Sequence, residues 1–134
     1  MIQMTLKLAE TALRAAQDKA KAFGTAMTIS VVDEAGRLVL CARGDGTGFF
    51  TPETSRAKAM AAAAFRRSNK DLAEMVAKGG FWGVVPTVLQ GQILPTLGAT
   101  PIVQGGVVIG AIGCGGGTGE QDQECSDAGA AAVK

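Results

Sequence analysis

Apolar positions along the chain follow two periods, one typical of helices and one typical of strands. Between Thr5 and Gly24 they recur every three or four residues, and these two flanking residues are of the types that begin and end helices. A first amphipathic helix is predicted there. In residues 26–32 apolar and polar side chains alternate, residues 33–36 are typical of a turn, and residues 38–43 are again mostly apolar. This pattern predicts a β-hairpin with one buried face.

Two further helices are predicted after this hairpin. Residues 52–67 begin with Pro-Glu, which is favoured in a first helical turn, and continue as an alanine-rich stretch. Residues 68–71 resemble a capping box and start a short helix that ends at Gly79-Gly80. In residues 81–94 the spacing of proline and glycine favours short strands and loops over a helix.

An apolar run rich in valine and isoleucine leads into a cluster of glycines. Residues 101–104 and 107–114 are predicted to form a second hairpin around Gly105-Gly106, a pair typical of tight turns. The last helix is predicted to open near Glu120, with Asp122 as a first-turn charge. A strand that passes through glycines into a helix N-terminus exposes backbone N–H groups, which favour an anion. We therefore expect this loop to form the floor of a ligand site.

Three of these glycines, Gly113, Gly115 and Gly116, surround Cys114. So many residues without a Cβ atom have two explanations, namely φ values that other residues avoid or the close approach of a ligand to the backbone. We expect the ligand to be the cause, so that an alanine at Gly115 or Gly116 weakens binding or turnover at least about tenfold and leaves stability nearly unchanged. If conformation is the cause, the same change should destabilise the free fold.

The predicted order of elements is helix, two strands, two helices, two or three strands, and helix. Because the strands come in hairpins, this order implies an α+β fold in which helices cover an antiparallel sheet, and not a doubly wound nucleotide-binding fold. The length of 134 residues, without a repeat or linker, predicts a single domain over residues 1–134.

Composition removes several classes of function. The chain has no histidine and no tyrosine, so acid–base chemistry would fall to Asp, Glu, Lys, Arg or Cys. A net charge of +1 with mixed signs does not predict nucleic-acid binding. The three cysteines are not spaced as metal ligands, so no metal site is expected, and their odd number suits a reducing cytoplasm better than a set of disulfides.

Charged residues are absent from residues 79–119. Glycines and prolines interrupt this stretch too often for a membrane span, so no membrane partner is expected. A long uncharged stretch in a small domain has to be covered. We expect it to supply the core and a subunit interface of a homo-oligomer, or in addition an apolar ligand pocket.

Four residues are candidates for chemistry, and each has a structural alternative. Arg43 and Asp45, at a strand end, are either a surface ion pair or part of a site. In a site Arg43 would bind a carboxylate with its planar guanidinium, and Asp45 would orient that ligand or move a proton. Lys58 belongs either to a solvated helix face or to a desolvated site as a base or anion holder. Cys114 is either a small core residue or, near a helix N-terminus, a nucleophilic thiol with a lowered pKa.

Four bulky aromatic side chains stand near these candidates in the sequence or in the uncharged stretch. They are Phe49, Phe50, Phe81 and Trp82. Their simplest role is in the core or an interface. The alternative is an apolar wall for a ring-bearing ligand.

Six short motifs, none specific alone, follow one another along most of the chain. They are Val31-Val32-Asp33 with Gly36, Arg43-Gly44-Asp45-Gly46, Arg56-Ala57-Lys58-Ala59, Pro101-Ile102-Val103 before Gly106, Gly110-Ala111-Ile112-Gly113, and Asp122 with Ala128-Gly129. In order and spacing they resemble the GlcG/HbpS family of haem-binding or haem-degrading domains, which is similar to the PduO C-terminal domain. The resemblance implies a fold similar to profilin and PAS domains, assembly into homo-oligomers, and a haem or corrinoid-related ligand in some members.

The chain departs from the family pattern at the site. Ala99-Thr100 stands where Gly-Gly is common before Pro-Ile, and Cys114-Gly115-Gly116 stands where Val-Ser-Gly is frequent. Since the chain has no histidine, haem iron would need Cys41, Cys114, Cys125, a methionine or a lysine as its ligand. We therefore expect no cofactor, with haem kept as the alternative.

The leading hypothesis is a cytoplasmic homo-oligomer that binds or converts a carboxylate-bearing catabolic intermediate. Its pocket would comprise the loop of glycines around Cys114, together with Arg43, Asp45 and Lys58. Cofactor-independent proton transfer, such as isomerisation, tautomerisation or addition–elimination, fits this set if the protein is an enzyme. The alternatives are a haem- or tetrapyrrole-binding module and a structural accessory subunit of a catabolic enzyme.

Overall fold

Two β-hairpins build the central sheet of the computed structural model, which describes residues 3–134. The first hairpin is β1 (Thr28–Asp33) with β2 (Leu38–Ala42), and the second is β3 (Ala99–Gln104) with β4 (Val107–Gly115). β1 and β4 also pair with each other, which gives a four-stranded antiparallel sheet of order β2-β1-β4-β3. The predicted α+β fold with an antiparallel sheet is confirmed.

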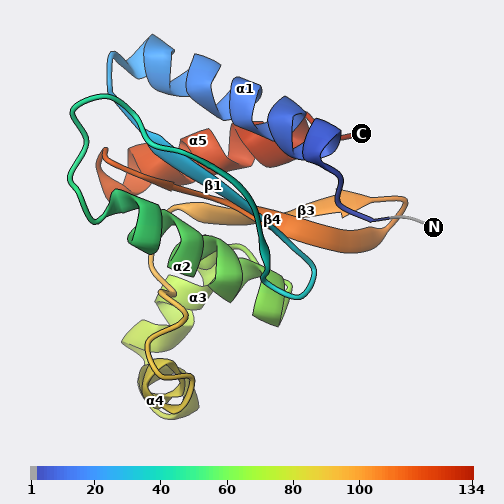
Figure 1. The fold of residues 1–134 in the computed structure, drawn as a ribbon. Helices are drawn as coiled ribbons and strands as arrows, with labels where there is room; N and C mark the ends of the chain where they lie inside the picture. The colour runs from blue at the N-terminus through green and yellow to red at the C-terminus, as the bar shows by residue number, and fades with distance from the viewer. Residues whose placement is uncertain (1–2) are drawn as a thin grey trace.

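Helices cover both faces of this sheet (Figure 1). α1 (Leu6–Phe23) and α5 (Gly119–Ala131) lie side by side on one face, and α2 (Thr51–Phe65) lies on the other. The alternation of side chains along β1 sets this division. Ile29 and Val31 belong to the core under α1 and α5, whereas Ser30 and Val32 face α2.

Small residues allow α2 to lie close to the sheet. Three alanines of α2 pack on Val32, Ala99 and Ala111, and they are Ala59, Ala62 and Ala63. The hydroxyls of Ser30 and Ser55 are 2.8 Å apart across the same interface. A Cβ atom at Gly113 would collide with the backbone oxygen of Ser55. Helix–sheet packing therefore explains the glycine at this position.

α3 (Asn69–Ala77) and α4 (Phe81–Val88) extend from α2 away from the sheet (Figure 1). The prediction of short strands and loops is wrong for residues 81–88, which are helical although Pro86 lies inside the helix. The reason is tertiary packing: Val85 is buried in a cluster with Leu72, and Trp82 packs against that cluster. Such contacts outweigh the cost of proline in a helix. The predicted order of elements allowed a third strand after the two central helices, and the helix α4 is found in that region instead.

Both hairpin turns use the residues that the sequence predicts. Gly105 and Gly106 have φ values of 60° and 77°, the left-handed conformation that this two-residue turn requires. In the first turn, the Asp33 carboxylate accepts hydrogen bonds from the backbone N–H groups of Ala35 and Arg37. Burial alone would raise the pKa of Asp33, but these bonds and the Arg37 guanidinium outweigh it and hold the pKa below its ordinary value.

None of the helices within residues 3–134 is long and apolar enough to cross a membrane.

Candidate functional site

A buried ion pair joins α2 to the first turn of α5 beside the glycine loop, which we define as residues 115–117. Nζ of Lys58 lies 3.0 Å from Oδ2 of Asp122 and donates a second hydrogen bond, also of 3.0 Å, to the carbonyl oxygen of Cys114. The two side chains are only 10% and 6% exposed. Oδ1 of Asp122 accepts a hydrogen bond of 2.9 Å from the backbone N–H of Gly117. One carboxylate thus holds both Lys58 and the loop.

Gly98, just before β3, provides the space in which this pair meets. Its φ is +124°, and a Cβ atom there would lie 2.8 Å from the carbonyl oxygen of Cys114, 2.9 Å from Cβ of Asp122 and 3.0 Å from Nζ of Lys58. A side chain at this position would therefore displace the ion pair. The position of Asp122 is fixed in turn by a complete capping box between Thr118 and Gln121, which begins α5.

The ion pair lines a cavity of about 380 Å³ between the start of α2 and the glycine loop. The other lining residues are Gly48, Phe50, Thr51, Thr54, Leu94 and the three glycines of the loop. An ammonium group has three N–H donors, and within residues 3–134 Lys58 uses two of them, on Asp122 and Cys114. The remaining donor of Lys58 favours a ligand with an anionic oxygen, whereas the hydroxyls of Thr51 and Thr54 already donate to carbonyl oxygens.

The three glycines around Cys114 have different roles. Gly116 has a φ of +127°, and a Cβ atom there would lie 2.8 Å from the backbone oxygen of Ala26, so its role is conformational. The expectation that an alanine at Gly116 leaves stability nearly unchanged is therefore wrong. At Gly115 a Cβ atom would meet only Oγ1 of Thr54, at an ordinary 3.6 Å. An alanine at Gly115 would extend into the cavity without backbone strain.

Arg43 and Asp45 lie outside this cavity, on an exposed part of the loop before α2. Nη2 of Arg43 donates a hydrogen bond of 2.8 Å to the carbonyl oxygen of Thr47. No salt bridge joins Arg43 to Asp45 in the part of the chain that the structure describes. Their predicted placement in one pocket with Lys58 is not observed. Buried hydroxyls connect this loop to the cavity, since Thr28 contacts both Thr47 and the cavity residue Thr51, at 2.9 and 2.8 Å, and Thr51 also contacts Thr47 directly, at 3.2 Å.

The Cys114 side chain lies in the core under α1 and α5, on the opposite face of β4 from the cavity. Burial above all, and then the neighbouring Cys125 thiol, raise the pKa of Cys114 well above its ordinary value. The predicted lowering of this pKa is wrong, because strand alternation turns the thiol inward. What Cys114 contributes to the site is its carbonyl oxygen, which binds Lys58.

The four aromatic candidates separate into two groups. Phe50 lines the cavity, is 54% exposed, and meets Phe49 edge to face with ring centroids 5.6 Å apart. Phe81 and Trp82 lie on α4, where Trp82 meets Phe65 at 4.9 Å and Phe81 is 62% exposed. The structure does not bring these two groups into one wall.

Asp122 and Asn69 connect parts of the site, and the sequence analysis did not identify either as a site residue. Asp122 was interpreted as a first-turn charge of the last helix. Its place in one of the six motifs is the signal that could have identified it. The buried side chain of Asn69 donates from Nδ2 to the carbonyl oxygens of Lys58, Leu94 and Thr96, at 3.2, 3.1 and 2.9 Å. Asn69 thereby ties the segment after α4 to the cavity, a long-range contact that no local pattern indicates.

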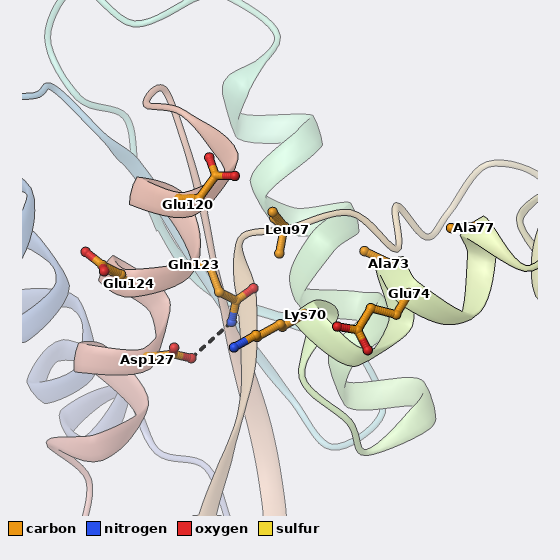
Figure 2. Close-up of a pocket in the computed structure, with 9 residues that line it drawn as sticks. All are labelled: Lys70, Ala73, Glu74, Ala77, Leu97, Glu120, Gln123, Glu124 and Asp127. Carbon is orange, nitrogen blue, oxygen red and sulfur yellow. Dashed lines mark hydrogen bonds between the residues drawn. The ribbon is translucent and has the colours of Figure 1, made fainter.

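A larger cavity of about 610 Å³ opens between α3 and α5 (Figure 2). Four carboxylates and a single lysine line it, namely Glu74, Glu120, Glu124, Asp127 and Lys70. Figure 2 shows Gln123 and Asp127 of α5 pointing toward Lys70 of α3 across the opening, whereas Glu124 points away from α3. None of the residues predicted for the site lines this cavity. Its charge also disfavours the anion for which the glycine loop is suited.

Known proteins resemble the chain over nearly its whole length. A 15.0 kDa protein encoded in the dhaT–dhaS intergenic region of Citrobacter freundii is 31% identical over 120 residues, which cover 90% of this chain and 84% of that protein. The structure of HbpS from Streptomyces reticuli, solved as a double mutant, is 28% identical, with a TM-score of 0.89 and coverage of 100% of this chain and 89% of HbpS.

A complex of the PduO C-terminal domain with haem has the same fold. Its TM-score is 0.91, with coverage of 99% of this chain and 96% of that domain, at 24% identity. The family model described as haem degrading protein HbpS-like matches residues 4–131. The chain therefore belongs to the family of HbpS-like haem degrading proteins, the family that its motifs resemble.

Proposed function

We propose that the chain binds an organic ligand by its carboxylate in the glycine-loop cavity. The observation that carries this proposal is Lys58, a buried cation that lines the cavity and, among the described residues, retains one N–H donor beyond its bonds to Asp122 and Cys114. The lower local dielectric strengthens the attraction of Lys58 for an anion and also the repulsion by Asp122, so the carboxylate would bind at the side of Nζ that faces away from Asp122. Gly115 leaves room for the ligand to approach the backbone.

Haem and smaller organic acids are two sources of such a carboxylate. The haem complex of the related PduO domain makes haem the first to test, since its two propionates match the chemistry of Lys58. The residues present do not fit haem held through its iron, because no histidine, cysteine, methionine or tyrosine is among the described residues that line the cavity, and Nζ of Lys58 is already bonded to Asp122 and to the carbonyl oxygen of Cys114. Binding here would rest on the propionates and on contact with Phe50.

Isothermal titration with hemin and with octanoate, in separate experiments, tests this proposal. We expect saturable binding to at least one of them, a loss of at least about tenfold in Lys58→Met, and retained binding in Lys7→Met, which removes an exposed lysine of α1 on the opposite face. Gly115→Ala should weaken binding without lowering the melting temperature, which separates a site effect from unfolding. Unchanged affinity in both Lys58→Met and Gly115→Ala would contradict the proposal, and failure of both compounds to bind would favour the accessory-subunit alternative.

Proton transfer is a second candidate, favoured by the fact that Lys58 and Asp122 line the cavity as a pair. Such a pair would exchange protons with a ligand held beside it, as isomerisation or elimination requires. Exchange of Cα hydrogens of the bound acid for deuterium, followed by NMR in D₂O, would reveal this activity. Exchange at the same rate with Asp122→Asn would contradict it.

The proposal includes a cytoplasmic homo-oligomer. Three cysteines without a disulfide suit a reducing compartment. The exposed apolar residues of α4 supply a surface that a second copy would cover, and they include Phe81, Val84 and Val88.

A further inference from the structure

A third cavity, of about 460 Å³, which we call the apolar cavity, shares Lys58 and Asp122 with the glycine-loop cavity. Its other lining residues come from α3, from the segment after α4 and from the start of α5, and they are Ala73, Val76, Pro95, Thr96, Leu97 and Gly119. Four of these six residues are apolar. The ion pair therefore lies at the boundary between a glycine-lined cavity and a more apolar one.

We propose that the two cavities form one site for an amphipathic monocarboxylate. The carboxylate lies at Lys58 and the glycine loop, and an unbranched apolar chain extends past the ion pair into the apolar cavity, against Val76 and Leu97. This inference rests on the proposed function and adds the class of ligand. The chemistry that selects the ligand is a single negative charge at one end of an apolar body.

Residues 94–97 contribute to the walls of both cavities and are held in place, so the apolar cavity exists before a ligand arrives. Leu94 lines the glycine-loop cavity, whereas Pro95 and Leu97 line the apolar cavity. The backbone N–H of Leu94 donates to the carbonyl oxygen of Ala57 at 3.1 Å, and Asn69 binds the carbonyl oxygens on both sides of Pro95. A preformed cavity costs less ordering on binding than a mobile one.

The acidic cavity limits what the far end of the ligand carries. Ala73 and Leu97 line both the apolar cavity and the larger cavity of Figure 2, which four carboxylates and one lysine also line. A second carboxylate at the far end of a long ligand would approach these like charges and would be repelled. A monocarboxylate should therefore bind better than the dicarboxylate of the same length.

Titration calorimetry with butyrate, hexanoate, octanoate and the dicarboxylate suberate tests this proposal. For the wild type we expect affinity to rise with chain length by up to roughly fourfold per added methylene until the cavity is filled, and octanoate to bind at least about tenfold more tightly than suberate. Val76→Trp and Ala73→Leu, which fill the apolar cavity from two positions, should abolish the dependence on chain length but retain butyrate binding. Val103→Trp, a change of the same kind at an exposed position of β3 outside both cavities, is the matched control and should keep the dependence.

The outcomes separate the two proposals. Chain-length dependence that persists in both filling variants, or equal affinity for octanoate and suberate, overturns the shared site. If hemin or butyrate still binds in a manner that requires Lys58 in that case, the proposed function stands without the apolar part. If none of the carboxylates binds to the wild type, the shared site is overturned, and the absence of hemin binding as well would overturn the proposed function.

Discussion

Removal of Lys58 provides the sharpest perturbation of the buried ion pair. Lys58→Met keeps most of the side-chain volume but leaves the Asp122 carboxylate, 6% exposed, with one hydrogen bond within residues 3–134, from the backbone of Gly117. Breaking a buried pair by removing one partner costs about 3–5 kcal/mol, because the remaining charge is desolvated without compensation. For a domain of this size, that loss corresponds to a fall in melting temperature of roughly 10–20 °C.

A double-mutant cycle isolates the pair from other effects. Asp122→Leu should also destabilise the fold, because it leaves the Lys58 cation with the Cys114 carbonyl oxygen as its only protein partner among the described residues. The double variant Lys58→Met/Asp122→Leu contains no unpaired charge at the pair and should lose less than either single variant.

Urea unfolding followed by circular dichroism measures the free energy of unfolding for each variant. The exposed-lysine control Lys7→Met should differ from the wild type by no more than about 0.5 kcal/mol. A loss below about 1 kcal/mol for Lys58→Met, or losses that simply add in the double variant, would refute the argument that the pair is buried and coupled.

Further predictions concern thiols, pH, the glycine before β3 and assembly. A thiol reagent such as DTNB should label Cys41 rapidly in the native protein and reach Cys114 and Cys125 only on unfolding, since both are buried and the pKa of Cys125 is raised to about 11; rapid labelling of all three would contradict this. The folded pKa of Asp33 lies below its unfolded value, near 4, so its contribution is present at neutral pH and is lost as the pH falls through the folded value. The difference in unfolding free energy between wild type and Asp33→Asn should therefore shrink in acid, and a constant difference would contradict the assignment. Gly98→Ala should lower the melting temperature by several degrees through both strain and displacement of the ion pair, at about 1 kcal/mol or more; an unchanged melting temperature would refute that role. Sedimentation velocity at micromolar concentration should show an oligomer, and a monomer would contradict the predicted interface.

The elements with strong local signals were predictable from the sequence. The Gly105-Gly106 turn requires two positive φ values, and the pattern of the flanking strands identifies both hairpins. α4 was not predictable, because Pro86 argues against a helix and only contacts with residues distant in sequence, such as Phe65, outweigh that local cost.

The candidate site was likewise predictable only where residue type and local pattern indicate a role. The glycine loop and Lys58 do line one cavity, as their residue types indicate. The partner Asp122 and the anchor Asn69 act across 64 and 11 positions of sequence, so their roles follow only from the packing of α2, α3 and α5. The prediction that Arg43 lies in the pocket with Lys58 was wrong, because its position at the end of a strand does not determine which part of the fold its side chain faces.

The central claim is that a carboxylate binds beside Lys58 in the glycine-loop cavity. A titration of ¹⁵N-labelled protein with hemin or octanoate, whichever saturates in the calorimeter, measures this directly through the backbone amide signals. The account predicts that the saturable changes centre on Gly115, Gly117 and Lys58, and that they are lost in Lys58→Met. Saturable changes confined to α4 or to the acidic cavity between α3 and α5 would contradict it.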